Sequence, residues 1–141
     1  MGKLICTLGL ALLVTVAACG DDNKLTFGAM AGTWNATEYL YIDAADDSTT
    51  YDVLAGVGVA LGIEVRANGT VIILIDGTPV DSSTATLQGD VVNLNTGGGD
   101  EWRVALNADN MTWTSLVTIP YDFDADGTSE DAFQRIRWHR N

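Results

Sequence analysis

The sequence predicts an all-β fold, a single antiparallel up-and-down barrel of eight strands. Apolar and polar residues alternate along several short runs, which is the period of a half-buried strand. Turn residues separate these runs at intervals of roughly 10 residues, as expected for a sandwich or barrel. The connections are of hairpin length, which favours sequential antiparallel pairing. Eight such strands enclose an interior that holds packed side chains or one small ligand.

The first expected strand covers 34–42, where Trp34, Ala36, Leu40 and Ile42 are predicted to share one face. The segment 43–55 is the only one in which a helical turn is expected. The remaining runs, in chain order, are 57–65, 71–75, 84–88, 91–95, 101–106, 111–119 and 132–140. Asn68-Gly69, between the second and third runs, is a typical two-residue hairpin turn.

The run 71–75 is apolar on both faces, with Val71, Ile73 and Ile75 on one and Ile72 and Leu74 on the other. A strand of this kind must be covered on both sides. One face is expected to line the barrel. The other is expected to contact a loop such as 44–56, or a partner protein of the cell envelope.

Residues 1–18 have the organisation of a secretory signal peptide. A charged residue, Lys3, precedes an apolar run over 4–16, and small residues follow. The apolar run is shorter than the roughly 20 residues that a spanning helix needs. Cleavage before Cys19 would leave residues 19–141, the size of one domain.

The ending Val16-Ala17-Ala18-Cys19 resembles the lipobox of bacterial lipoproteins. This resemblance implies that Cys19 is acylated and anchors the protein to membrane lipid, with 19–26 as a tether before a domain over 27–141. Several acyl chains on one residue hold a protein firmly to a bilayer. Gly20 follows the cysteine and the acidic residues come one place later, which favours the outer membrane of a bacterial cell envelope. Cys6 leaves with the signal peptide, so the mature chain has no cysteine pair for a disulfide.

Charge excludes nucleic acid as a partner. Seven Lys and Arg stand against nineteen Asp and Glu, a formal net charge of −12, and loss of Lys3 makes the mature chain more acidic still. Such a surface repels phosphate backbones and suits solubility, cation binding or a basic partner.

Three short segments together resemble the small bacterial lipocalin-like lipoproteins. They are Gly32-Thr33-Trp34, then Asp52 to Ala55 with Ala67 to Val71, and Tyr121 to Asp131 leading into a strand that ends at Arg140. The resemblance implies a barrel that binds a small apolar ligand. It also implies a structural pair in which a basic side chain, Arg140 or in reserve Arg137, covers Trp34 through a cation–π contact.

The segment 122–130 is a candidate calcium loop. Asp122, Asp124, Asp126 and Gly127 occupy the first, third, fifth and sixth positions of such a loop, where carboxylates converge and glycine permits the turn. The carbonyl of Thr128 and the side chain of Glu130 would follow. Phe133 stands where the bidentate Glu is expected, and Asp131 replaces it only if the loop closes early. The alternative is a solvated acidic hairpin.

Catalysis finds little support, so we expect a protein that is not an enzyme. His139 is the single histidine and is expected to be exposed, and Ser115 lies within a strand without a nucleophile motif. Two functions remain open. In the first, the barrel binds a small apolar ligand in a cavity lined by Trp102, Val104, Leu106 and Trp113. In the second, the same residues fill the core of a structural or interaction lipoprotein.

Overall fold

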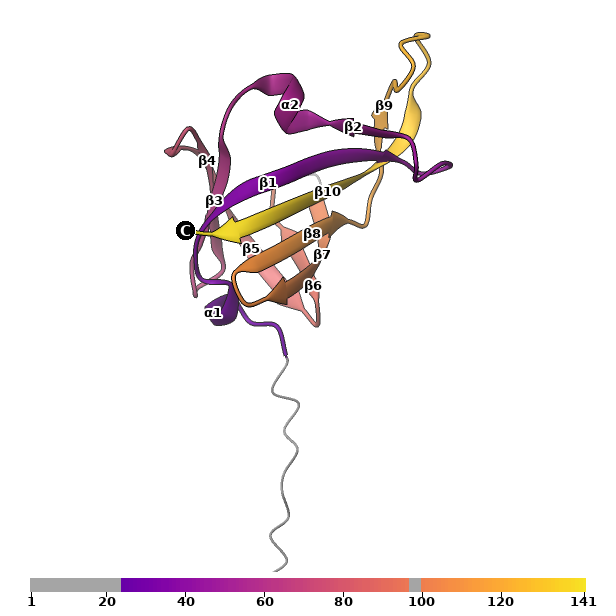
Figure 1. Ribbon diagram of the computed structural model, residues 1–141. Coiled ribbons are helices and arrows are strands. Elements are labelled where there is room, and N and C mark those ends of the chain that lie inside the picture. The colour runs from indigo at the N-terminus through magenta and orange to yellow at the C-terminus, as the bar shows by residue number, and fades with distance from the viewer. Residues whose placement is uncertain (1–23, 97–99) are drawn as a thin grey trace, which may run out of the picture.

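The computed structural model describes residues 24–96 and 100–141; the expected signal peptide, Cys19 and the start of the tether lie outside these residues (Figure 1). Within the described residues there are ten strands and two short helices. The helices are α1 (Phe27–Met30) and α2 (Val53–Val57). The strands are β1 (Gly32–Asp43), β2 (Thr50–Asp52), β3 (Leu61–Val65), β4 (Thr70–Ile75), β5 (Thr78–Gln88), β6 (Val91–Leu94), β7 (Asp100–Asn107), β8 (Asn110–Ser115), β9 (Ile119–Tyr121) and β10 (Glu130–Arg140).

Eight of these strands close into an antiparallel barrel, which confirms the predicted fold class. Their order is β1-β3-β4-β5-β6-β7-β8-β10, and β10 pairs back onto β1 from Trp34 opposite Arg140 to Asp43 opposite Ala132. Each neighbour in this order is the next barrel strand along the chain, so the topology is up-and-down. The short strands β2 and β9 add to the outer ends of β1 and β10, where these two strands extend beyond the barrel (Figure 1).

The predicted strand over 57–65 is wrong in its first half. Asp52 caps α2 by accepting a hydrogen bond from the backbone N–H of Ala55, and Gly58 ends the helix with a left-handed backbone (φ 67°). Val57 and Val59 are exposed, so their alternation does not reflect a buried strand face. The sheet resumes only at Leu61. The expected helical turn is present, but it extends beyond 43–55.

The strand predicted over 111–119 is also divided, because β8 ends at Ser115 and β9 begins at Ile119. Val117, between them, is exposed and does not share the inner face of Met111 and Trp113. On the other side of the barrel β5 begins at Thr78, earlier than predicted, and its first residues are exposed.

A β-bulge in β1 reverses the predicted alternation. Trp138 lies opposite Ala36 and Arg137 lies opposite Glu38, so Thr37 is an extra residue in the ladder. Beyond the bulge Tyr39 lies opposite Ile136, on the inner face. Leu40 and Ile42 therefore lie on the face opposite to Trp34, contrary to the sequence prediction.

The core is richest at the end of the barrel that α1 covers, called here the closed end. Trp34 is fully buried and its indole N–H donates to the carbonyl of Met30, at 2.8 Å. Trp102, Trp113 and Trp138 are buried along the interior as well. Leu74, on the outer face of β4, is only 9% exposed, so this chain already covers it. No helix within 24–96 and 100–141 is long and apolar enough to span a membrane.

Candidate functional site

Arg140 lies across the closed end, over the ring of Trp34. Its Cζ is 4.2 Å from the ring centroid, and its two terminal nitrogens donate to the carbonyls of Ala31 and Ala29, at 2.7 and 3.1 Å. This is the residue that the lipocalin resemblance implied. Arg137, the reserve candidate, lies on the outer face and pairs with Glu38.

The backbone at Gly32, two residues before Trp34, requires a glycine. Its φ of +138° is a conformation that side chains rarely adopt, and a Cβ there would lie 2.9 Å from a guanidinium nitrogen of Arg140. The glycine in the Gly-x-Trp sequence therefore makes room for the arginine that covers the indole. The role of the whole group is structural.

The opposite end of the barrel, called here the mouth, contains an apolar cavity of about 220 Å³. It lies where β3 and β7 begin and where β4 and β6 end. Aliphatic and aromatic side chains form most of its wall, and the lining residues are Tyr39, Leu61, Ile63, Val71, Ile73, Leu94, Thr96, Asp100, Trp102, Trp113, Ile136 and Trp138.

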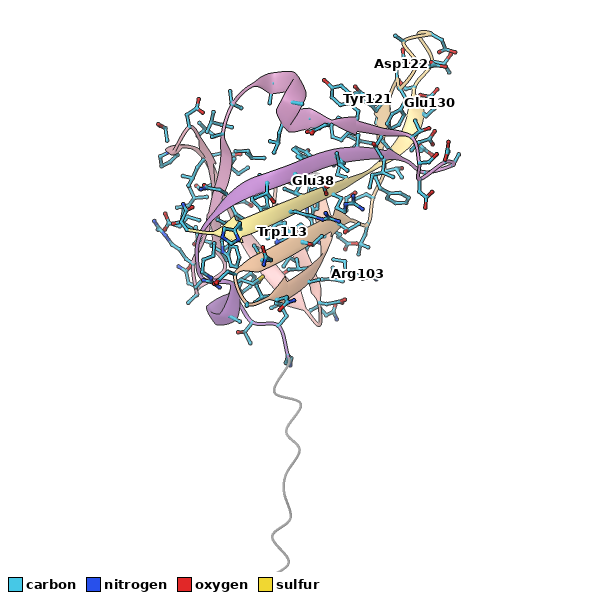
Figure 2. The ribbon with its side chains drawn as sticks, in the orientation of Figure 1. Glu38, Arg103, Trp113, Tyr121, Asp122 and Glu130 are labelled. Atoms are coloured by element: carbon cyan, nitrogen blue, oxygen red, sulfur yellow. The ribbon has the colours of Figure 1, made fainter. Side chains whose placement is uncertain are left out.

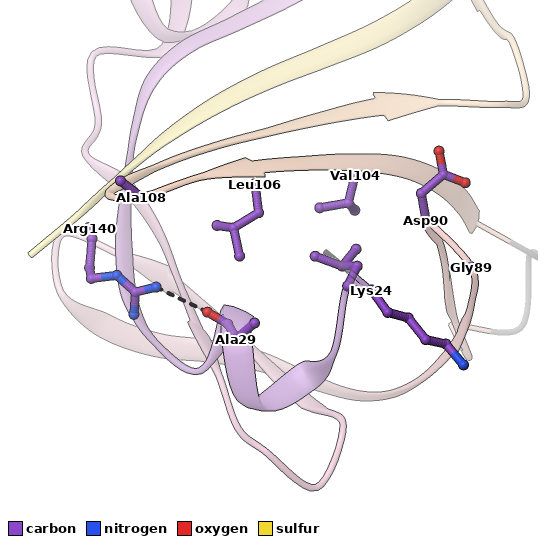
Figure 3. Close-up of a pocket in the computed structure, with 9 residues that line it drawn as sticks. Lys24, Ala29, Gly89, Asp90, Val104, Leu106, Ala108 and Arg140 are labelled. Atoms are coloured by element: carbon purple, nitrogen blue, oxygen red, sulfur yellow. Dashed lines mark hydrogen bonds between the residues drawn. The ribbon is translucent and has the colours of Figure 1, made fainter. Parts of the chain in front are cut away.

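The four residues predicted to line a ligand are divided between the two ends of the barrel. Trp102 and Trp113 line the cavity at the mouth. Val104 and Leu106 instead point toward the segment that carries Lys24, in a larger and more open groove at the closed end (Figure 3). Charged residues, including Arg140, contribute to that groove. Its volume is about 750 Å³.

Polar side chains form a layer at the mouth, above the tryptophans. The hydroxyl of Tyr39 donates to Gln134, and burial raises the pKa of Tyr39 well above its usual value, with smaller contributions from Tyr41 and Asp100. Asp100 accepts a hydrogen bond from the hydroxyl of Thr96, at 2.6 Å. The sequence prediction missed Tyr39 and Asp100. Counting back by two from Trp102 places Asp100 on the inner face, but the bulge hides the position of Tyr39.

Three tryptophans leave their indole N–H groups without a nitrogen or oxygen partner in the part of the chain that the structure describes. They are Trp102, Trp113 and Trp138. Their rings pack in series, with centroids 6.0 Å apart for the first pair and 6.3 Å for the second. Buried donors of this kind are uncommon in folded proteins.

The acidic loop between β9 and β10 brings together Asp122, Asp124 and Asp126, with carboxylate oxygens that lie within 4.8 Å of one another. Asp122 also accepts from the backbone N–H groups of Asp126 and Gly127. Figure 2 shows Asp122 and Glu130 at the end of the molecule away from α1.

The side chains of Glu130 and Asp131 are not part of this group. Glu130 accepts instead from the backbone N–H of Phe123, at 3.0 Å. The side chain of Asp131 is exposed on β10, where its residue pairs with Pro120. The backbone N–H of Thr128 donates to Asp126, at 2.7 Å. The loop therefore brings together three of the four predicted carboxylates, and the fourth, Glu130, binds the backbone instead.

An aromatic cluster beside this loop was not predicted. Tyr121 packs against Tyr41, Tyr51 and Phe123, with ring centroids 4.9, 5.1 and 4.9 Å away respectively. It holds β2 and β9 against the extended ends of β1 and β10. His139, at the other end of β10, is exposed as predicted and contacts Asn110.

Comparisons of the chain with protein-family models, with curated proteins and with solved structures find no match. The class of protein is therefore defined by the architecture itself. It is a closed eight-stranded antiparallel barrel of lipocalin-like form, covered at one end and hollow at the other.

Proposed function

We propose that this protein is a lipid-anchored envelope lipoprotein whose barrel binds one small apolar molecule at the mouth, without chemical conversion. The observation that carries the proposal is the cavity of about 220 Å³ walled by Trp102, Trp113, Trp138 and aliphatic side chains. An apolar cavity of about 150 Å³ in another protein binds benzene. Pockets for drug-sized molecules measure roughly 300–1,000 Å³. The proposed ligand is therefore of the size of a single ring or a short alkyl chain.

The position of Lys24 determines how a barrel anchored through Cys19 would be oriented. Lys24 and α1 lie at the closed end, and the mouth lies at the other end of the barrel (Figure 1). An acylated Cys19, five residues before Lys24, would hold the closed end toward the membrane and leave the mouth facing the aqueous phase. Incorporation of labelled palmitate into the wild-type protein, and its loss in Cys19→Ser, would test the anchor.

Native mass spectrometry of protein purified from its own host tests ligand binding. Ile73 lines the cavity, whereas Ile72 is the half-buried residue beside it on the same strand and faces away. We expect a retained small molecule in the wild type and in Ile72→Phe, and its loss in Ile73→Phe, where the larger ring occupies the cavity. If the wild type retains nothing and binds no small apolar probe, or if Ile73→Phe retains the same mass, the binding proposal is wrong.

A filled barrel that acts only through protein contacts is less well supported. Leu74, one of the two apolar residues expected to meet a partner, is already covered by this chain. The core is packed at the closed end, around Met30 and Trp34, but not at the mouth.

A further inference from the structure

We propose that the ligand of the mouth cavity is a small apolar amine. Its ammonium group binds at the carboxylate of Asp100, and its hydrocarbon body lies among the tryptophans. This inference rests on the proposed binding function and adds the charge of the ligand to it.

Asp100 is the one charged residue that lines the cavity among the residues that the structure describes. It is two places before Trp102 on β7, and its partner across the ladder is Leu94, which packs against the core. Both relations place its side chain on the inner face of the barrel. Asp100 is partly buried there, so its carboxylate has lost part of its hydration on an otherwise apolar strand face.

The pairing that Asp100 has within the chain is incomplete. The hydroxyl of Thr96 donates to one carboxylate oxygen. No lysine or arginine forms an ion pair with Asp100 within 24–96 and 100–141; Arg103 pairs with Asp90 and Arg135 pairs with Glu38. The second carboxylate oxygen has no hydrogen-bond donor within the same residues. A cationic ligand group would supply both the charge and the donor that the protein leaves out.

The remaining wall also favours a cation over an anion. Tyr39 and three tryptophans surround the space, and aromatic ring faces attract an ammonium or alkylammonium group. The chain as a whole carries a formal net charge of −12, which raises the local concentration of cations and lowers that of anions. The indole N–H groups of the three tryptophans would favour an acceptor, but the carboxylate of Asp100 lines the same cavity and opposes an anionic one.

Three single-ring probes of similar shape test the charge: 2-phenylethylamine, the neutral 2-phenylethanol and the anionic 3-phenylpropionate. Tryptophan fluorescence titrations and calorimetry at pH 7 would measure their Kd. We expect the amine to bind the wild-type protein at least tenfold more tightly than the alcohol, and the anion to bind most weakly. Raising the salt concentration from 0.05 to 0.5 M should weaken amine binding severalfold and leave the alcohol unchanged.

Asp100→Asn keeps the hydrogen bond with Thr96 and removes the charge. We expect this variant to bind the amine at least tenfold more weakly and the alcohol as well as the wild type does. Glu101→Gln is the matched control, because it removes an equal charge from the neighbouring exposed residue. It should leave the affinity for the amine within twofold of the wild type. Near-UV circular dichroism establishes that each variant keeps its tryptophan packing.

The amine proposal is overturned if the wild-type protein binds the alcohol or the anion as tightly as the amine, or if salt affects all three probes alike. Alcohol binding that Ile73→Phe abolishes would still support the proposed cavity function. If no probe binds and native mass spectrometry finds no retained molecule, both the amine proposal and the binding proposal fail.

Discussion

Replacing Arg140 by methionine tests how the closed end is held together. Methionine keeps most of the length and apolar contact of the arginine stem but has neither the charge nor the N–H donors. The change removes the contact with the ring of Trp34 and the two hydrogen bonds to the carbonyls of Ala31 and Ala29. Those bonds hold the segment between α1 and β1 against the end of β10.

The expected loss can be worked out from these contacts. The guanidinium is partly exposed, so the cation–π contact contributes about 1 kcal/mol. Each hydrogen bond contributes about 0.5–1.5 kcal/mol, because water can reach the carbonyls that are released. The ion pair with Asp109, 3.7 Å long and largely exposed, adds little. Arg140→Met should therefore destabilise the barrel by roughly 2–4 kcal/mol, a fall in Tm of about 8–16 °C for a domain of this size.

Urea denaturation followed by tryptophan fluorescence would measure this change, with Arg137→Met as the control. Arg137 is the other candidate from the sequence, lies on the same strand and forms an exposed pair with Glu38, so its loss should cost at most about 1 kcal/mol. Arg140→Lys keeps the charge without the planar fork and should fall between the two. The reasoning is refuted if Arg140→Met lies within 0.5 kcal/mol of the wild type, or if Arg137→Met is the more damaging change.

Three other predictions follow from the structure. Folding raises the pKa of Tyr39, so the stability that its protonated hydroxyl contributes is present below pH 10 and is lost as the pH rises further. Between pH 9 and 11.5, the free energy of unfolding of Tyr39→Phe should therefore fall by about 1–2 kcal/mol less than that of the wild type, as measured by urea denaturation. If the acidic loop binds Ca²⁺, 10 mM Ca²⁺ should raise Tm by a few degrees, which corresponds to about 1.4 kcal/mol at a concentration of ten times the Kd. The double variant Asp124→Ala with Asp126→Ala should not show this rise, and the absence of a shift in both proteins would exclude the site. Deletion of Thr37 removes the bulge and keeps every later side chain on its face of β1, so the near-UV circular dichroism of the tryptophans should be retained. Deletion of Leu40 should abolish this signal. An equal loss of signal in both variants would contradict the assignment of the bulge.

The strands could be predicted where their determinants are local. The hairpin between β3 and β4 lies where Asn68-Gly69 predicts it, but the turn is one residue earlier than predicted. The N–H of Gly69 donates to the carbonyl of Arg66, and Gly69 follows the turn with a positive φ (86°), which Asn68 does not have. The alternation of Trp102 and Val104 identified β7 and its inner face. Barrel closure depends on the pairing of β1 with β10, which are the first and last strands of the domain in sequence. The number and spacing of the strands were the only basis for predicting this pairing.

The errors have physical causes that a single sequence hides. Thr37 is a polar strand residue like any other, yet it forms the bulge that moves Tyr39 into the barrel. Val57 and Val59 alternate with small residues as a strand does, although Asp52 and Gly58 are a good helix cap and a good helix end. In the acidic loop Asp122, Asp124 and Asp126 converge as predicted, whereas Glu130 accepts a hydrogen bond from the backbone N–H of Phe123, a contact that the sequence does not reveal.

These errors affect the ligand site more than the fold, because the two depend on different parts of the chain. The fold needs alternation along eight strands, which tolerates a bulge and a short helix. The polar part of the cavity wall depends on single residues, Tyr39 from β1 and Asp100 from the start of β7. Tyr39 packs against the core, but Asp100 is the first residue of β7 and is only partly buried, so substitution of Asp100 can alter the chemistry of the ligand while the barrel persists. Asp100→Asn should accordingly weaken amine binding at least tenfold and leave the free energy of unfolding almost unchanged.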